Sequence, residues 1–154
     1  MIRHAVADDA TVLAAMLRDL NSEPGLHPER ITPESVLQDL IGDPRMILLI
    51  AEVSGVASGF ATAHPYYDSG ASRWGMILND LYVAPGARRR GLGRALIGAM
   101  ASEALQAGGS FLWWDADHGD ELAQAFHRSL GAVEEPTVSF LLGGTTFLRH
   151  AVRG

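Results

Sequence analysis

The order of apolar and polar positions predicts four helices along the chain. Apolar side chains recur at helical spacing up to Asn21, and Asp8 or Asp9 can cap the start of this first helix. Thr32 followed by Pro33 is a cap with a first-turn proline, which predicts the start of a second helix. The four helices are expected to span residues 8–21, 33–41, 91–107 and 121–130.

Between these helices the pattern changes to continuous apolar runs or to alternation, which is typical of strands. The expected strands are 2–6, 46–53, 56–64, 76–83, 110–116, 132–142 and 145–151. Ser54-Gly55 and Gly143-Gly144 indicate hairpin turns, whereas the helix at 91–107 crosses over between two strands that are then parallel. The element order β-α-α-β-β-β-α-β-α-β-β predicts an α/β (α+β) fold in one domain over 1–154. Its mixed, mostly antiparallel sheet would have about seven strands and flanking helices.

The amino-acid composition excludes several kinds of protein and binding partner. The 18 acidic and 12 basic residues give a net charge of -6, which argues against nucleic-acid binding. No apolar run approaches the roughly 20 residues of a membrane span. The charged start MIRHAVADDA is unlike a signal peptide, so we expect a cytoplasmic protein with no membrane partner. The chain has no cysteine, and its six histidines lack the spacing of metal ligands, so we expect no metal.

The stretch RRRGLGRAL (88–96) departs from this acidic composition. Four of the 12 basic residues flank its two glycines, between a predicted strand and a predicted helix: Arg88, Arg89, Arg90 and Arg94 around Gly91 and Gly93. Helix N-termini expose unpaired N–H groups and favour anions, and glycine lets a ligand approach the main chain closely. The stretch therefore predicts a phosphate-binding loop. A plain turn with solvated arginines is the alternative.

A dinucleotide-binding loop is a second alternative. Gly91-Leu92-Gly93 supplies the G-x-G, and Asp115 lies 22 residues after Gly93, near the expected place of a ribose-binding acid. Against it, Leu96 holds the third glycine position, the loop begins seven residues after the strand, and only one β-α-β unit is predicted. A Walker loop is excluded because the chain has no lysine.

The same stretch resembles the R/Q-x-x-G-x-G/A motif of the GNAT superfamily of acyl-CoA N-acyltransferases. The preceding LNDLYVAPGA is similar to that family's strand and loop, and AFHRSLGA (125–132) is similar to a later helix. The predicted element order is also the family's, so the resemblance covers essentially the whole chain. Four segments resemble the spermidine/spermine and thialysine acetyltransferase branch: ITPESVLQDLIGD (31–43), GFATAHPYYD (59–68), LNDLYV and the later LGA.

The resemblance implies acetyl-CoA as co-substrate. Main-chain amides from Arg89 to Arg94 would hold its diphosphate, and main-chain groups of Leu81 to Val83 would bind the pantetheine arm and polarise the thioester carbonyl. Asp120 stands where the family has an Asn near the pantetheine, and it can also cap the helix that follows. The implied cofactor-binding residues are Leu81, Tyr82, Val83, Arg88, Arg89, Arg90, Gly91, Leu92, Gly93, Arg94 and Asp120.

The resemblance also points to His127 and Asn79 as catalytic positions. The family's proton donor is a Tyr four residues before a helix-ending glycine, and His127 holds that position. A histidine can act as a general acid near neutral pH, whereas a helix histidine without chemistry is the alternative. The polyamine branch has a Glu at the position of Asn79, which cannot take a proton, so a water chain to a nearby acid would deprotonate the amine. Strand alternation directs the neighbouring Asp80 to the other face of the sheet. The candidate acceptor-binding residues are Ser22, Glu23, Asp68, Asp80 and Asp115.

These features predict an N-acetyltransferase that transfers the acetyl group of acetyl-CoA directly to a primary amine. The acceptor would be a small molecule, such as a polyamine, a diamine or an amino-acid-like amine. A homodimer that shares C-terminal strands is expected from the family. The alternatives are a protein N-terminal or lysine acetyltransferase, and a CoA-binding module without catalysis.

Overall fold

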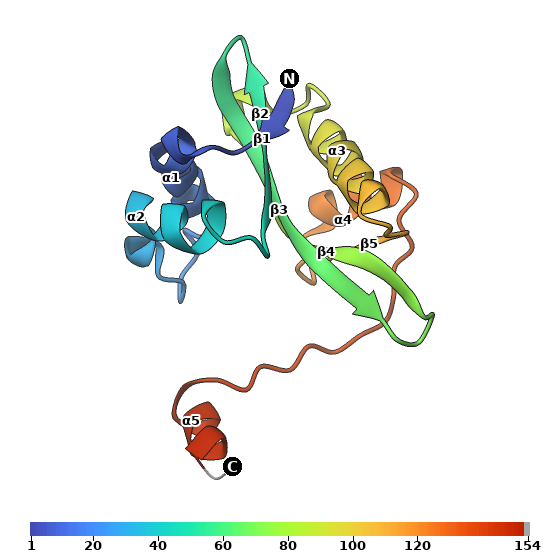
Figure 1. Cartoon of the computed structure of the whole chain (residues 1–154). Helices are drawn as coiled ribbons and strands as arrows, with labels where there is room; N and C mark the ends of the chain where they lie inside the picture. The colour runs from blue at the N-terminus through green and yellow to red at the C-terminus, as the bar shows by residue number, and fades with distance from the viewer. Residues whose placement is uncertain (153–154) are drawn as a thin grey trace. The chain divides into compact units, whose positions relative to one another are not determined.

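The computed structural model describes residues 1–152 and divides into two compact units. The first unit, Met1–Asp115, contains a five-stranded sheet in the order β1-β2-β3-β4-β5 (Figure 1). The second unit begins at Ala116, and its described part contains two helices joined by a segment without regular secondary structure. The single domain expected over 1–154, whose last two residues lie outside the described part, stays a prediction.

The elements of the first unit follow the predicted order. Its strands are β1 Ile2–His4, β2 Ile47–Val53, β3 Val56–Asp68, β4 Arg73–Val83 and β5 Leu112–Trp113. Its helices are α1 Ala10–Leu20, α2 Pro33–Val36 and α3 Leu92–Gln106. Neighbouring strands from β1 to β4 are antiparallel, and β5 is parallel to β4 because α3 crosses over between them. The predicted class, a mixed and mostly antiparallel sheet with flanking helices, is confirmed.

The two flanking layers are built from apolar helix faces. Figure 1 shows α1 and α2 on one side of the sheet and α3 on the other. On the α1 side, Leu13 of α1 and Val36 of α2 pack in one cluster with Ile50, Phe60 and Tyr82 of the strands. Since side chains alternate along a strand, every second residue of β3 counted from Phe60 faces this same side.

Local chemistry starts the second helix as predicted. The Ser35 N–H donates to the Thr32 hydroxyl at 3.0 Å, and the Thr32 N–H donates to the Ser35 hydroxyl at 3.0 Å. This reciprocal cap satisfies two N–H groups at the helix start. After Val36 the helix continues as a π-helical turn, Leu37–Ile41, so it ends where the sequence predicts.

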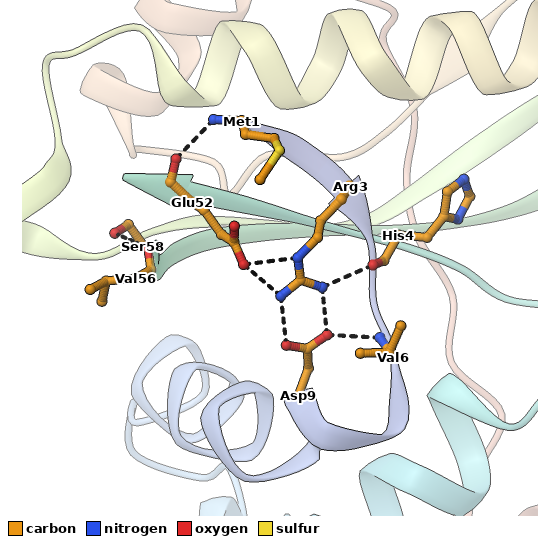
Figure 2. A network of polar contacts seen from close by, with 8 residues as sticks. All are labelled: Met1, Arg3, His4, Val6, Asp9, Glu52, Val56 and Ser58. Carbon is orange, nitrogen blue, oxygen red and sulfur yellow. Dashed lines mark hydrogen bonds and ion pairs between the residues drawn. The ribbon is translucent and has the colours of Figure 1, made fainter. Parts of the chain in front are cut away.

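The predicted cap of α1 is wrong. A 3-10 turn, Ala7–Asp9, precedes the helix, and the Asp9 carboxylate does not cap α1. It accepts two bonds from Arg3 (2.7 and 2.9 Å) and one from the Val6 N–H (2.7 Å), as Figure 2 shows. Arg3 Nε also donates to Glu52 at 2.8 Å. A guanidinium binds a carboxylate more strongly than a neutral N–H does, so Asp9 ties β1 to α1 instead.

The C-terminal strands predicted over 132–142 and 145–151, with their hairpin, are also wrong. The second unit contains α4, Glu121–Ser129, and α5, Gly144–Val152, and no strand lies between Ala116 and Val152. A strand requires a hydrogen-bonded neighbour, whereas a helix satisfies its main chain locally. The Phe147 N–H, for example, donates to the Gly143 carbonyl at 3.2 Å. The described chain therefore has five strands rather than about seven.

Candidate functional site

A bulge in β4 centres on Asn79. Thr62 of β3 pairs with Asp80, but the next residue, Ala63, pairs with Leu78. Asn79 is therefore the extra residue that the ladder leaves out. A bulge of this kind bends the strand and changes the direction of the side chains around it.

The bulge brings Asn79 and Asp80 to one face of the sheet. The Thr62 hydroxyl donates to an Asp80 carboxylate oxygen at 2.5 Å, and Asn79 Nδ2 lies 3.0 Å from Nδ1 of His64. Thr62 and His64 are two residues apart on β3, so they share a face, and their partners on β4 share it too. The prediction that Asp80 points away from Asn79 is wrong, because regular alternation does not hold across a bulge.

Two aromatic side chains extend this face toward β5. Tyr66 follows His64 on the same side of β3, and its ring lies edge-on to Trp113 with centroids 5.8 Å apart. Trp113 is 39 % exposed. We call this set the bulge face: Thr62, His64, Tyr66, Asn79, Asp80 and Trp113. It is the same side of the sheet that packs against α1 and α2.

The strands β4 and β5 separate beside the bulge. Their parallel ladder consists of Met76 with Leu112 and Ile77 with Trp113, and β4 then continues to Val83 past the end of this ladder. A strand that leaves its neighbour directs alternate N–H and C=O groups into the widening gap. A molecule that bonds to this edge of β4 would thus lie against the bulge.

Alternation decides which main-chain groups face the gap. The Ala84 N–H donates to the Ser58 carbonyl of β3 at 2.8 Å, so residues 84 and 82 direct their main-chain groups toward β3. Leu81 and Val83 direct theirs the other way, toward the gap, so their contacts with pantetheine stay a prediction. The main chain of Tyr82 faces β3 instead, so its predicted main-chain contact is wrong. The Val83 carbonyl accepts a bond from Arg88 Nε at 2.9 Å. Tyr82 instead uses its side chain, whose hydroxyl donates to Asp19 of α1, and burial together with this bond raises its pKa.

The arginine and glycine loop joins β4 to α3. A 3-10 turn, Pro85–Ala87, is followed by two left-handed residues, Arg89 (φ 63) and Gly91 (φ 79), and the helix then begins at Leu92. Left-handed backbone is unfavourable for a side chain such as that of Arg89, and such strain clusters at binding sites. Only glycine adopts the conformation of Gly91 without strain.

The loop fits a diphosphate. The first main-chain bond of α3 runs from the Ala95 N–H to the Gly91 carbonyl at 3.0 Å, so the N–H groups of Leu92 and Gly93 precede the helix's own ladder. Apart from the adjoining main chain, nothing lies within 4 Å of the place where a Cβ on Gly91 would stand. Arg89 and Arg90 are exposed beside it. Open main chain at a helix N-terminus with cations around it is a site for phosphate oxygens.

The other predicted acceptor residues do not belong to the set that defines the bulge face. The Ser22 hydroxyl donates to the Asp19 carbonyl at 2.9 Å, and Glu23 is exposed in the same loop after α1. Asp68 accepts from the Gly70 N–H at 3.1 Å and from Arg73 at 3.4 Å, in the turn between β3 and β4. Asp115 is exposed and lies two residues after Trp113.

His127 and Asp120 belong to the second unit, on α4. Asp120 caps this helix, since its carboxylate accepts from the Ala123 N–H at 3.1 Å, as the sequence predicts. His127 is half-buried, and burial lowers its pKa below the ordinary 6.5, while the Asp120 carboxylate acts in the opposite direction. Gly131 (φ 84) follows the end of the helix. The catalytic role of His127 stays a prediction.

Sequence reasoning missed His64. Its position in an alternating strand carries no signal of chemistry, because the contact that singles it out depends on the bulge in the partner strand. Among residues 1–152, no group of three or more His, Asp or Glu side chains could hold a metal ion. In the same residues, every helix is too short or too polar to cross a membrane.

Comparison with known proteins identifies the family. The sequence model of the acetyltransferase (GNAT) family matches residues 14–132. The chain is 28% identical over 134 residues to the uncharacterised N-acetyltransferase YhfO of Bacillus subtilis strain 168, covering 87% of this chain and 90% of that one. It is 28% identical over 106 residues to the aminoglycoside N(6')-acetyltransferase type 1 of Salmonella typhimurium strain LT2, covering 67% of this chain and 73% of that one.

The fold is shared with solved structures. The aminoglycoside N-acetyltransferase AAC(6')-Iy in complex with CoA superposes with a TM-score of 0.73 at 25% identity, over 92% of this chain and 97% of that one. Its complex with a bisubstrate analogue gives a TM-score of 0.78 at 24% identity, over 92% and 95% of the two chains. The dinucleotide-binding alternative is excluded by this fold and by the mostly antiparallel sheet. The chain therefore belongs to the acetyltransferase (GNAT) family and is an N-acetyltransferase that uses acetyl-CoA as co-substrate.

Proposed function

We propose that the enzyme transfers the acetyl group directly to a primary amine of a small, cationic molecule, with acetyl-CoA and the amine bound at the same time. Direct transfer is favoured because the chain has no cysteine, the side chain that most readily forms an acyl-enzyme. The main support for a cationic acceptor is the bulge face, where a carboxylate and two aromatic rings share one side of the sheet.

Acetyl-CoA would bind along the gap beside β4. The loop from Arg88 to Arg94 would hold the diphosphate through main-chain N–H groups, and the arginine side chains would attract it from a distance. Leu81 and Val83 would bond the pantetheine arm through their main chain. This arrangement would bring the thioester, which supplies the acetyl group, to the end of β4 where the bulge lies.

The bulge face suits an amine that carries positive charge. Asp80 offers a carboxylate, and Tyr66 and Trp113 offer aromatic rings, which attract cations. The net charge of -6 would also draw a cation toward the protein. Ser22, Glu23 and Asp115 remain proposed contacts for more distant parts of the acceptor. Asp68 is a weaker candidate, because it lies four residues from His64, about 13 Å along the strand, and is bonded to Arg73.

Relatives favour an aminoglycoside-like acceptor over a polyamine. The relative from Salmonella typhimurium acts on aminoglycosides, and so does the solved AAC(6')-Iy. The spermidine/spermine branch has no such support here and stays a prediction from short motifs. An aminoglycoside carries several amines on a hydroxylated ring, and its positive charge suits a face with the Asp80 carboxylate and the rings of Tyr66 and Trp113.

A panel assay tests the proposal. The protein is incubated with acetyl-CoA and, separately, with a 6'-amino aminoglycoside, spermidine, thialysine and a lysine-containing peptide, and released CoA thiol is measured. We expect the highest kcat/KM with the aminoglycoside. Release with the peptide alone would support a protein acetyltransferase instead. No release with any amine, in a protein that binds CoA, would overturn the proposal.

A homodimer is the second part of the proposal. Large apolar side chains are exposed along the second unit, among them Val138 (77 %), Phe140 (93 %) and Leu141 (96 %). Exposed apolar side chains in one continuous segment indicate a surface that another chain or element covers. Light scattering is expected to give twice the 16.5 kDa chain mass. Phe140→Asp should shift the mass to one chain, and a wild-type monomer would exclude the dimer. The cytoplasmic location stays a prediction.

A further inference from the structure

We infer that His64 accepts the proton of the acceptor amine and that Asn79 is the residue that positions its ring. The inference rests on the proposed function and names a residue that the reaction needs. An amine with a pKa well above 7 is an ammonium ion near neutral pH and must lose a proton before its nitrogen can attack. Histidine is the side chain whose ordinary pKa suits this task.

The position of the pair supports this role. Asn79 is the bulged residue, and the ladder between β4 and β5 ends two residues earlier at Ile77 and Trp113. His64 pairs directly with Ile77 in the antiparallel ladder. The ring of His64 is therefore held at the point where β4 leaves β5, next to the main-chain edge proposed for the pantetheine arm.

Two acids on these strands, Asp80 and Asp68, are already bonded to other side chains. Asp80 accepts the hydroxyl of the buried Thr62 at 2.5 Å. Asp68 is bonded to Arg73 at the far end of the β3–β4 hairpin. Asn79 itself cannot take a proton. His64 is thus the group on the bulge face with a titratable nitrogen to spare.

The contact with Asn79 fixes one ring nitrogen and leaves the other for the substrate. Asn79 Nδ2 and His64 Nδ1 are 3.0 Å apart, and a half-turn of the carboxamide exchanges Nδ2 for Oδ1. With Oδ1 facing the ring, Nδ1 carries the hydrogen and Nε2 has an open lone pair. With Nδ2 facing the ring, Nε2 carries the hydrogen and would meet an ammonium ion with another N–H.

The first of these forms is the working one for two physical reasons. Only a lone pair on Nε2 can accept a hydrogen from an ammonium ion. After the transfer both ring nitrogens carry hydrogen, and the Nδ1–H still donates to Oδ1 of Asn79. With Nδ2 of Asn79 facing the ring, protonation of His64 would place the Nδ1–H of the ring opposite an N–H of Asn79, and the two donors would repel. The charged neighbour of Asn79 on β4 is Asp80, and the residues of β2 that pair with this end of β3, Ile47 and Leu48, are uncharged.

In the proposed reaction, the acceptor nitrogen loses two protons in all. The ammonium ion gives one proton to His64 Nε2 and becomes a neutral amine. Its nitrogen lone pair then forms the N–C bond to the acetyl carbon while the C–S bond of acetyl-CoA breaks. The nitrogen then releases its second proton to water, the departing sulfur takes one proton from a general acid or from water and leaves as the CoA thiol, and His64 returns its proton to water.

Variants of His64 test the assignment by activity. We expect His64→Gln and His64→Ala to lower kcat/KM by about 100-fold or more, the usual range for loss of a general base. The acid limb of the pH profile should disappear in both, while CoA binding measured by calorimetry should be unchanged. His4→Ala is the matched control, because His4 lies on β1 and bonds to Glu103 of α3. This variant should have the same kcat/KM as wild type.

Variants of Asn79 test the positioning role and separate the two forms of the pair. Asn79→Asp keeps an acceptor for Nδ1–H and removes the donor, whereas Asn79→Leu removes both. We expect Asn79→Asp to exceed Asn79→Leu by about tenfold in kcat/KM, and its acid limb to move to higher pH, because a carboxylate favours the charged ring. If Asn79→Asp is the slower of the two, the inference is wrong.

Nitrogen-15 NMR gives a readout that does not depend on activity. The ring shifts of the wild-type protein report which nitrogen carries hydrogen, and we expect the Nδ1–H form of neutral His64. An Nε2–H form overturns the inference, even if both His64 variants fail to fold. Wild type that acetylates an amine while His64→Ala is equally fast overturns the inference alone. Wild type that acetylates no amine overturns the proposed function and this inference together.

Discussion

The Thr62 hydroxyl donates to the Asp80 carboxylate across β3 and β4, and the register shifts in the very next residue pair. Thr62 is fully buried, so its hydroxyl has no access to water and depends on Asp80 as acceptor. The bond fixes β4 on one side of the bulge, as the contact between His64 and Asn79 fixes it on the other. Two cross-strand bonds thus hold the bulge in place.

Removal of this acceptor should destabilise the protein. We expect Asp80→Ala to lower the free energy of unfolding by about 1–3 kcal/mol, because it leaves the buried Thr62 hydroxyl without a partner. Urea denaturation measures the change. Asp68→Ala is the control, since the acid is partly exposed and its pair with Arg73 is worth at most about 1 kcal/mol. Equal effects of the two substitutions would contradict the role given to the Thr62 bond.

The loop before α3 yields a prediction about two glycines. Gly91→Ala places a side chain in a left-handed conformation and beside the proposed diphosphate site, so CoA affinity should fall about tenfold, or about 1.4 kcal/mol. Gly98→Ala lies in the same helix, with open space around its Cβ, and should stabilise the helix by about 0.5–1 kcal/mol without a change in affinity. Calorimetry with CoA and thermal unfolding measure both. Similar CoA affinities of the two variants would contradict the proposal that this loop binds CoA.

The ion pair of Arg3 and Asp9 predicts a dependence of stability on pH. The Arg3 hydrogen bonds hold the pKa of Asp9 below its ordinary 3.8, despite the opposing effect of burial. A carboxyl whose pKa is lowered in the folded state contributes stability above the unfolded pKa and loses it as pH falls through the folded value. We expect Asp9→Asn to be less stable than wild type at pH 7 by about 1–3 kcal/mol. The difference should shrink below about pH 3.8.

Urea unfolding at several pH values between about 7 and 3 checks this sign, because paired carboxylates lose their contribution to stability as the pH falls from about 5 to 1. Asp8→Asn is the control, because Asp8 is exposed in the same 3-10 turn, Ala7–Asp9, and its substitution should change stability little. A difference between wild type and Asp9→Asn that grows as the pH falls would contradict the assignment.

The sequence predicts where the helices and strands of the first unit lie better than it predicts the contacts between their side chains. Helix caps and turns such as Thr32-Pro33 and Ser54-Gly55 act locally, so their elements appear where the pattern places them. The bulge at Asn79 depends on how two strands align, and no residue near it marks the shift. His64 was missed for the same reason, and the direction of Asp80 was wrong.

The C-terminal error has a different cause. Residues 145–151 follow a Gly-Gly pair and begin Thr-Thr-Phe, which suits a strand, but the same residues can also form a helix. A strand at this place requires a neighbour that sequence cannot supply, whereas a helix requires none. The structure has the helix, α5, from Gly144 to Val152. The sequence pattern therefore predicts an element correctly when its main-chain hydrogen bonds are local. It does not when those bonds depend on a partner strand.

The half-buried His127 on α4 gives the last prediction. As a general acid it would have to be protonated, and burial lowers its pKa below 6.5, so the rate that depends on it should fall as pH rises through that lowered value. His127→Ala should lose about 10-fold or more in kcat at pH 5.5, and the deficit should shrink toward pH 8. Asp120→Asn keeps the helix cap but removes the charge that supports the protonated ring, so it should move the fall in rate to lower pH. His118→Ala, in the exposed loop before α4, serves as the control. A His127→Ala profile that matches wild type at every pH would show that the thiol leaves without help from this residue.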